Sequence, residues 1–167
     1  IILFFPSNIL ANDNFNIWLK SFSIKAFNEG VSTQTINKVL SNARFLPNVI
    51  KYDRYQPEFY EDTKTYINKR VTKKKIKEGL KLYNKNKMLI DKIENNFNVE
   101  KELLLSLMGI ETNYGNYLGK MDIISSLATL SYDKRRSEFF SKELITILKL
   151  IDLGLVDPEI LYGSWAG

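Results

Sequence analysis

Apolar residues recur along this chain at intervals of three and four residues, and no segment sustains an alternation of apolar and polar residues. Side chains spaced in this way lie on one face of an α-helix, whereas those of a half-buried strand alternate every second residue. The spacing therefore predicts an all-α fold. With 167 residues, 44% of them hydrophobic, the chain is long enough for one domain with its own core.

Capping residues and breaks divide the first part of the chain. Asp13 is expected to cap a first helix that ends at Gly30, and Ser32 to cap a second helix. Residues 44–60 contain two prolines and lack a helical period, which predicts an ordered loop or an extended arm. The side chains expected to face the core from the two helices are Phe15, Trp18, Leu19, Phe22, Ile36, Val39 and Leu40.

A lysine-rich helix is expected to begin at Thr72 and to run toward Phe97. Ile76, Leu80 and Tyr83 lie at helical spacing within it, so its lysines are expected to form the solvated face. The net charge of +5 also fits a basic domain that binds nucleic acid. That alternative stays open, although no recognition motif accompanies the lysines.

Three further elements are expected toward the C-terminus. Asp122 begins one helix, the next helix ends at Gly154, and Asp157 with Pro158 starts a short last turn. The apolar faces of the two helices consist of Ile123, Ile124, Leu127, Leu130, Phe140, Leu144, Ile147, Leu148 and Ile151.

The first eleven residues, IILFFPSNILA, form an apolar stretch that closes on small residues. Such a stretch is typical of the end of a secretory signal peptide, and it is too short to span a bilayer. A buried N-terminal strand or helix is the alternative, and Pro6 and the polar switch at Asn12 count against it. We therefore expect residues 1–11 to be the remnant of a signal peptide. No other segment is apolar enough to cross a membrane.

The chain has no cysteine and no histidine. These absences exclude disulfides, thiolate metal sites and cysteine nucleophiles, and they remove the most common general base and metal ligand. Acid–base chemistry must therefore come from carboxylates, lysines or tyrosines. A chain without cysteine can function on either side of a membrane.

Glu111 stands out in the stretch LLLSLMGIETNYGNYLG. We expect Asn98 to cap the helix that carries it, and Gly115 and Gly119 to stop that helix. Leu107 and Glu111 share a helix face with other apolar residues, so the carboxyl group is expected to point inward. Partial burial disfavours the charged form of a carboxyl group, which lets it donate a proton near neutral pH.

The surroundings of Glu111 in the sequence suit the cleavage of a glycosidic bond. Gly109 and Gly115 are expected to leave room for a substrate to approach the backbone. Tyr114 and Tyr117 offer flat faces on which sugar rings can stack. By its spacing alone, however, a single glutamate near a helix end is more often solvated or paired than catalytic.

Several segments together resemble the lytic murein transglycosylase B family. They are VIKYDRYQPEF, YINKRV, GIETNYGNYLGKMDIISSLATLSYDKRRSEFFSKEL and GSWAG, and they occur in the order that the family shows. The similarity covers essentially residues 15–167. The GIETNYG motif followed by SLATLSYDKRRSEFF is the most specific part.

The resemblance implies a lysozyme-like α-helical enzyme at the cell envelope, in the periplasm of a Gram-negative bacterium. It would cleave the β-1,4 bond between N-acetylmuramic acid and N-acetylglucosamine in peptidoglycan. The family's catalytic glutamate falls on Glu111, which protonates the leaving oxygen and then acts as a base toward the muramoyl 6-hydroxyl, so that a 1,6-anhydro product forms. The serine that supports it falls on Ser164. The resemblance implies no metal and no cofactor.

In relatives, the segment that begins with GSWAG continues into a glutamine-bearing loop and further helices that complete the substrate groove. We therefore expect residues 12–167 to be the N-terminal part of a single catalytic domain, truncated at the C-terminal side of the groove. A chain of this length is expected to be inactive by itself. A non-catalytic module that binds glycan strands through Tyr114 and Tyr117 is the second alternative.

Charged residues outside the Glu111 motif are expected to stabilise the fold. Asp133, Arg135 and Arg136 are predicted to form ion pairs that lock the two helices after Glu111. Asp53 and Arg54 have the same interpretation. An arginine at these positions that contacts acidic peptide stems of the substrate is the alternative.

Overall fold

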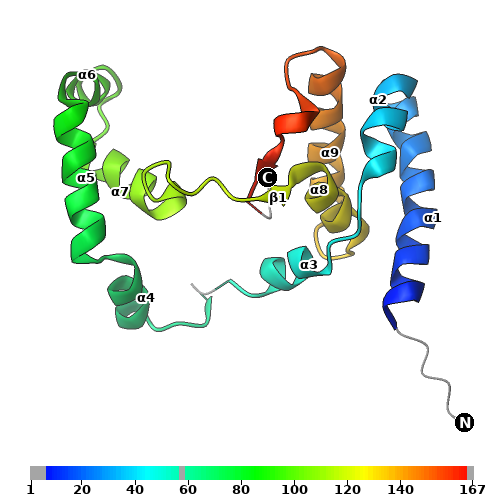
Figure 1. Ribbon diagram of the computed structural model, residues 1–167, viewed down its shortest axis with the longest axis horizontal. Coiled ribbons are helices and arrows are strands. Elements are labelled where there is room, and N and C mark those ends of the chain that lie inside the picture. The colour runs from blue at the N-terminus through cyan, green and yellow to red at the C-terminus, as the bar shows by residue number, and fades with distance from the viewer. Residues whose placement is uncertain (1–6, 57–58, 165–167) are drawn as a thin grey trace, which may run out of the picture. The chain divides into compact units, whose positions relative to one another are not determined.

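The computed structural model describes residues 7–56 and 59–164, and it describes side chains from Asp13 onward (Figure 1). The chain divides into two compact units, which we call the first unit (Ile1–Tyr55 with Gly119–Gly167) and the second unit (Gln56–Leu118). Helices dominate both units, so the prediction of an all-α fold is confirmed. Each unit is described by itself below.

The first unit contains most of the buried apolar side chains. Its elements are α1 (Ser7–Asn28), α2 (Thr33–Lys38), η1 (Leu40–Asn42), α3 (Pro47–Arg54), β1 (Met121–Asp122), α8 (Ile123–Tyr132), α9 (Ser137–Asp152), η3 (Pro158–Ile160) and β2 (Tyr162–Gly163). Helix α8 is buried along nearly its whole length, because it packs along α9 and also against α1 and α3 (Figure 1). It is the central helix of this unit.

An aromatic cluster joins α1 to α8. The ring of Phe15 lies 5.5 Å from Trp18, 5.4 Å from Phe45 and 5.5 Å from Tyr132 between centroids. Aromatic pairs at these separations add about 0.5–1.5 kcal/mol each beyond the burial of their surface. The core predicted for the first two helices is confirmed: Trp18 and Val39 are half-buried, and the other predicted members are buried.

The second unit is a small bundle of α4 (Thr63–Arg70), α5 (Lys73–Lys85), α6 (Lys87–Phe97) and α7 (Lys101–Thr112). Helix α7 packs against both α5 and α6. Glycines aside, Ile90 is the only described residue of this unit with a buried apolar side chain. Ile76 and Leu80, expected to be the buried face of the lysine-rich helix, are 52% and 58% exposed. That part of the prediction is wrong, because the buried residue of α5 is Gly79 and the helix meets its neighbours along a different side.

Four predicted caps are confirmed, and all are local hydrogen bonds from a backbone N–H to a side-chain oxygen three or fewer residues earlier. Ser32 accepts from Thr35, Thr72 from Lys75, Asp122 from Ser125 and Asp157 from Glu159. The predicted ends at Gly30 and Gly154 are also confirmed, since both glycines adopt left-handed φ angles directly after helices.

One expectation for the N-terminal part is wrong, and another stays a prediction. Helix α1 begins at Ser7, so Asp13 lies inside it and caps nothing. Residues 1–6 of the predicted signal-peptide remnant lie outside the described residues, while residues 7–11 are helical, and the assignment of residues 1–11 stays a prediction. No helix within residues 7–56 and 59–164 is both long enough and apolar enough to cross a membrane.

Residues 47–54 form helix α3 in place of the predicted loop. Pro47 occupies its first turn, where a missing N–H costs nothing, and Val49 and Asp53 form its buried face. A buried face that contains a carboxylate has no apolar period, and this hid the helix in the sequence.

The helix predicted from Thr72 to Phe97 is interrupted at Asn86, which ends α5 and precedes α6. Asn98 adopts a left-handed conformation and ends α6, so it does not cap α7. Glu94 takes over that role, because its carboxylate accepts from the backbone N–H of Lys101 at 3.1 Å and from its Nζ at 2.8 Å. These different helix ends and caps explain why the boundaries of α5, α6 and α7 differ from the prediction.

The predicted ion pairs form, but they join different elements. Asp53 is 1% exposed and binds Arg136 at 2.7 Å and Arg135 at 2.9 Å, while Arg54 binds Asp133 at 2.6 Å. The residues between α8 and α9 are therefore fastened to α3. The expectation that they lock α8 to α9 directly is wrong.

Candidate active site

Glu111 lies in the last turn of α7 and is exposed. The expected inward direction is wrong, because the neighbours on its face, Leu107 and Met108, are themselves 49% and 38% exposed. The buried residue of this helix is Gly109, so α7 meets the rest of its unit along a different side. Glu111 can therefore be reached from solvent.

The chain turns back immediately after Glu111. Asn113 and Tyr114 both adopt left-handed conformations, with φ angles of 49° and 59°. The backbone N–H of Tyr114 donates to the carbonyl of Met108 at 2.9 Å, and the N–H of Gly115 donates to Oγ1 of Thr112 at 2.9 Å. Helix α7 therefore ends at Thr112, before Gly115, and a hydrogen-bonded turn follows Glu111.

Tyr114 is half-buried, and its ring lies against Gly79 of α5 and Gly109 of α7. A Cβ atom added at Gly109 would lie 2.8 Å from both Cζ and Oη of Tyr114. Gly109 thus leaves room for this ring and not for substrate, contrary to the prediction. The space beside Gly115 is open, since nothing lies within 4 Å of a Cβ added there.

Tyr117 differs from Tyr114 in its exposure. Its side chain is 66% exposed, and its backbone N–H donates to the carbonyl of Thr112 at 2.8 Å. The turn thus anchors the backbone of Tyr117 and leaves its ring exposed. Whether either tyrosine contacts a sugar stays a prediction.

Ser164 belongs to the first unit and follows β2 directly. Strands β1 and β2 pair antiparallel, with Met121 opposite Gly163 and Asp122 opposite Tyr162. No sequence pattern predicted this pair of strands, because two residues are too few to show an alternation. Ser164 is exposed, and its predicted hydrogen bond to Glu111 stays a prediction.

Gly119 lies very close to the backbone of strand β2 and of Ser164. A Cβ atom added at Gly119 would lie 1.9 Å from the carbonyl oxygen of Gly163 and 2.6 Å from the backbone nitrogen of Ser164. Gly119 also has a φ angle of 81°, in the region that favours glycine. The backbone at Ser164 is therefore fixed by a crossing that only glycine permits.

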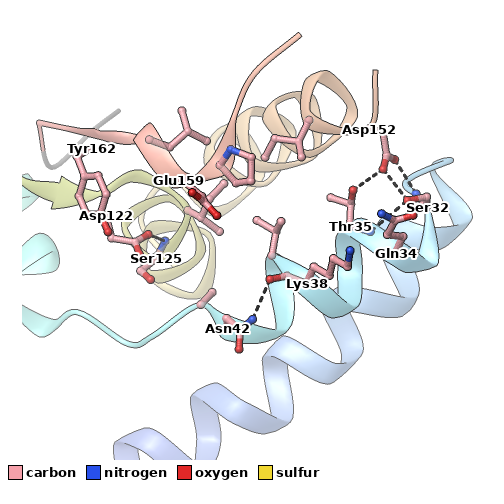
Figure 2. A pocket seen from close by; sticks show the side chains of 16 residues that line it. Ser32, Gln34, Thr35, Lys38, Asn42, Asp122, Ser125, Asp152, Glu159 and Tyr162 are labelled. Atoms are coloured by element: carbon pink, nitrogen blue, oxygen red, sulfur yellow. Dashed lines mark hydrogen bonds between the residues drawn. The ribbon is translucent and has the colours of Figure 1, made fainter. Parts of the chain in front are cut away.

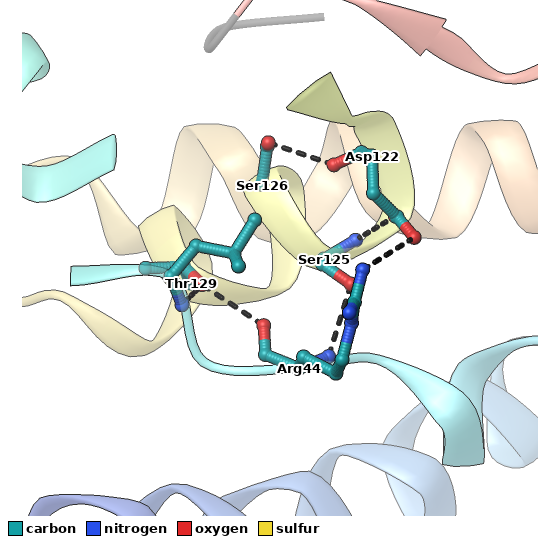
Figure 3. Close-up of polar contacts among 6 residues, drawn as sticks. Arg44, Asp122, Ser125, Ser126 and Thr129 are labelled. Carbon is teal, nitrogen blue, oxygen red and sulfur yellow. Dashed lines mark hydrogen bonds and ion pairs between the residues drawn. The ribbon is translucent and has the colours of Figure 1, made fainter. Parts of the chain in front are cut away.

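Buried hydroxyl groups of α8 hold the segment that leads into α3 (Figure 3). Oγ of Ser125 accepts from the backbone N–H of Arg44 at 3.0 Å, and Oγ1 of Thr129 accepts from that of Leu46 at 3.0 Å. Asp122, which caps α8, also lies 3.9 Å from the Arg44 guanidinium. Sequence patterns did not single out these hydroxyl residues, because they stand among apolar residues on a helix that is buried all round.

A pocket of about 760 Å³ lies within the first unit, between α2, the end of α9 and η3 (Figure 2). At its edge, both the backbone N–H and Oγ of Ser32 donate to Asp152, and Oγ1 of Thr35 does the same. These hydrogen bonds, with that from the Ser32 hydroxyl the largest cause, hold the pKa of Asp152 below its usual range. The sequence did not indicate this pocket.

Metal binding has no obvious location in the described part of the chain. No group of three or more aspartate and glutamate side chains there is arranged to hold a metal ion. In the second unit, three carboxylates are each bound by lysine or arginine: Glu61, Asp91 and Glu94.

The described part of the chain is thus an all-α fold in which Glu111 lies exposed at the end of α7, followed by a glycine-containing turn. Residues 14–167 match the family described as the transglycosylase SLT domain, and the chain belongs to that family. The resemblance inferred from the sequence motifs is confirmed.

Relatives give the scale of the match. The chain is 30% identical over 148 residues to the membrane-bound lytic murein transglycosylase B of Escherichia coli strain K12, and the match covers 83% of this chain and 41% of that protein. It superposes on SltB3 of Pseudomonas aeruginosa, solved in complex with NAG-NAM-pentapeptide, with a TM-score of 0.79 and 29% identity, over 92% of this chain and 41% of that one.

A third similar structure is the Escherichia coli lytic transglycosylase Slt35 in complex with bulgecin A. The TM-score is 0.78 and the identity 30%, over 93% of this chain and 49% of that one. The chain therefore spans somewhat less than half the length of the relatives that it matches.

Proposed function

We propose that the protein containing this chain is a lytic transglycosylase of bacterial peptidoglycan, and that Glu111 is its acid and base. The observation that carries the proposal is the position of Glu111: it belongs to the GIETNYG motif of a chain in the transglycosylase SLT domain family, and it lies exposed where α7 ends. Glycan strands are the proposed substrate, because a relative of known structure was solved with NAG-NAM-pentapeptide.

The proposed reaction needs a single carboxyl group. Glu111 donates its proton to the glycosidic oxygen as the bond between that oxygen and C1 of the muramoyl residue breaks. The carboxylate then accepts the proton of the 6-hydroxyl while that oxygen bonds to C1. No water is added, so the product carries a 1,6-anhydro ring, and Glu111 regains its proton.

Local hydrogen bonds hold the backbone on both sides of Glu111. Glu111 lies in the last turn of α7, and the residues that follow it curl back through hydrogen bonds to Met108 and Thr112. The backbone therefore presents Glu111 at a fixed place.

Ser164 is the proposed partner that orients the Glu111 carboxyl group through a hydrogen bond, and Tyr117 the proposed platform for a sugar ring. The crossing at Gly119 supports the role of Ser164, because it fixes the backbone at that serine. The exposure of Tyr117 supports its contact with sugar. The prediction that Tyr114 also contacts sugar has less support, because its ring is half-buried against Gly79 and Gly109.

The proposed location is the cell envelope, and more specifically the periplasm of a Gram-negative bacterium, because peptidoglycan lies there. The excess of 24 lysine and arginine residues over 19 aspartate and glutamate residues suits a substrate with acidic peptide stems. The side chains of Arg135 and Arg136 are each more than two fifths exposed to solvent while they bind Asp53.

Mass analysis of the products tests the function directly. The whole protein is incubated with purified peptidoglycan, and the soluble muropeptides are measured. We expect muropeptides that are one water lighter than the products of hydrolysis. Reducing ends would instead indicate a hydrolase, and binding to peptidoglycan without release of any product would support the glycan-binding alternative.

A further inference from the structure

Tyr114 has a backbone conformation that is costly for a tyrosine. Its φ angle of 59° is left-handed, and the preceding Asn113 has a φ angle of 49°. A left-handed conformation costs a residue with a Cβ atom about 1–2 kcal/mol. Contacts of Tyr114 must therefore compensate for its position in the turn after Glu111.

The ring of Tyr114 finds these contacts in a slot that two helices share. Gly79 is the buried residue of α5 and Gly109 that of α7. A Cβ atom added at Gly79 would lie 2.6 Å from Oη of Tyr114, and one added at Gly109 would lie 2.8 Å from Cζ. Real Cβ atoms essentially never approach another heavy atom this closely, so a larger residue at either position requires the ring to move.

The two glycines have a cost of their own. A glycine inside a helix is less favourable than alanine by about 0.5–1 kcal/mol. Helices α5 and α7 each contain such a destabilising glycine in the interior, at the place where the Tyr114 ring packs. The ring and the two glycines therefore form one packing unit, which we call the Tyr114 slot.

The slot acts on the end of the helix that carries Glu111. The backbone N–H of Tyr114 donates to the carbonyl of Met108, one turn before Glu111, and the ring contacts Gly109 of the same turn. Through Gly79 the ring also contacts α5. The last turn of α7 is thus fixed to a second helix by a side chain only three residues from Glu111.

We propose that Tyr114 is a positioning residue for Glu111: its ring, held between Gly79 and Gly109, sets the direction in which the carboxyl group meets the substrate. This inference rests on the proposed catalytic function of Glu111. It assigns Tyr114 to the support of the acid and away from sugar stacking. A displacement of about 1 Å at a reacting group can lower the rate about a hundredfold, so a support of this kind affects turnover.

Gly79→Ala in the whole protein is the first test. Gly79 is on a different helix from Glu111, and the added methyl group must displace the ring. We expect kcat to fall about tenfold to a hundredfold with KM nearly unchanged, since substrate contacts are preserved. Asn84→Ala, an exposed change on the same helix, is the control and should leave both constants unchanged.

A double-mutant cycle with Tyr114→Ala shows whether the ring is responsible. Without the ring, the three atoms nearest to the added methyl group are absent, and Gly79→Ala replaces a helical glycine by a better helix former. We expect it to lower the melting temperature in the wild-type background and to raise it in the Tyr114→Ala background. Tyr114→Phe removes the Oη atom nearest to Gly79, so it should keep a kcat close to wild type and restore part of the activity that Gly79→Ala removes.

The outcomes separate this inference from the proposed function. A Tyr114→Ala variant with raised KM and unchanged kcat would establish sugar stacking and overturn the positioning role. Unchanged kcat in Gly79→Ala, with Glu111→Gln inactive, would also overturn it while the function stands. If the wild-type protein releases no anhydro product, the proposed function fails, and the reversal of the stability effect still decides whether the slot exists.

Discussion

Asp53 is a charged side chain in the interior of the first unit, 1% exposed and bound by Arg135 and Arg136. Removal of one partner of a buried ion pair costs about 3–5 kcal/mol, and less here because both arginines remain partly exposed. We expect Asp53→Ala to lower the free energy of unfolding by about 2 kcal/mol, measured by urea denaturation. Glu138→Ala, which removes an exposed pair with Lys142, should change it far less. Equal effects would contradict the structural role of Asp53.

Asp152 should make the free energy of unfolding depend on pH under acidic conditions. Hydrogen bonds from Ser32 and Thr35 lower its pKa in the folded state relative to the unfolded chain. A lowered folded pKa gives a stabilising contribution that is complete above the ordinary value of about 3.9 and is lost as the pH falls through the folded pKa. We expect Asp152→Asn to lower the melting temperature near pH 7, and to lower it progressively less below about pH 4. A difference from wild type that does not change between these pH values would argue against the contact.

At the residue scale, the sequence was sufficient to select Glu111 but not to orient it. The motif around Glu111 is local, so it can be read along the chain. The direction of its side chain depends on which face of α7 meets α5 and α6, and that face is set by Gly109 and the ring of Tyr114. A contact between residues 79 and 114 leaves no periodic signal in the sequence.

At the scale of elements, local signals were predicted well and distant ones were not. The caps at Ser32, Thr72 and Asp122 involve residues three apart and were correct. Helix α3 was missed because its buried face includes Asp53, whose partners are about eighty residues away. The start of α7 was misplaced because its first backbone donor binds Glu94 from another helix.

The crossing of Gly119 with β2 leads to a prediction about glycines. Gly119 and Gly115 have φ angles of 81° and 79°, so alanine is strained to the same degree at both. Only at Gly119 would the new methyl group also collide with the backbone of Gly163 and Ser164. We expect Gly119→Ala to lower the melting temperature of the whole protein by several degrees more than Gly115→Ala. Similar shifts in the two variants would mean that the crossing is not tight in solution.

At the scale of the whole molecule, the two units differ in their cores. Nearly all of the buried apolar side chains described belong to the first unit, and Ile90 is the one that belongs to the second unit. Regions with few buried apolar contacts open more readily, which exposes their amides to exchange. We expect hydrogen exchange to be faster in α5 and α7 than in α8 and α9. Equal protection of both pairs of helices would show that the second unit is stabilised by contacts beyond those described.

The central claim is that Glu111 transfers the proton in a lytic transglycosylase, and release of anhydromuropeptides by the Glu111→Gln variant of the whole protein tests it most directly. The amide keeps the shape of the side chain but cannot transfer a proton as the acid does. We expect the variant to release less than about a hundredth of the wild-type product with a melting temperature nearly unchanged, because Glu111 is exposed. Glu102→Gln makes the same chemical change at an exposed position in the first turn of α7 and should retain wild-type activity. Release by the Glu111→Gln variant within tenfold of wild type would contradict the account.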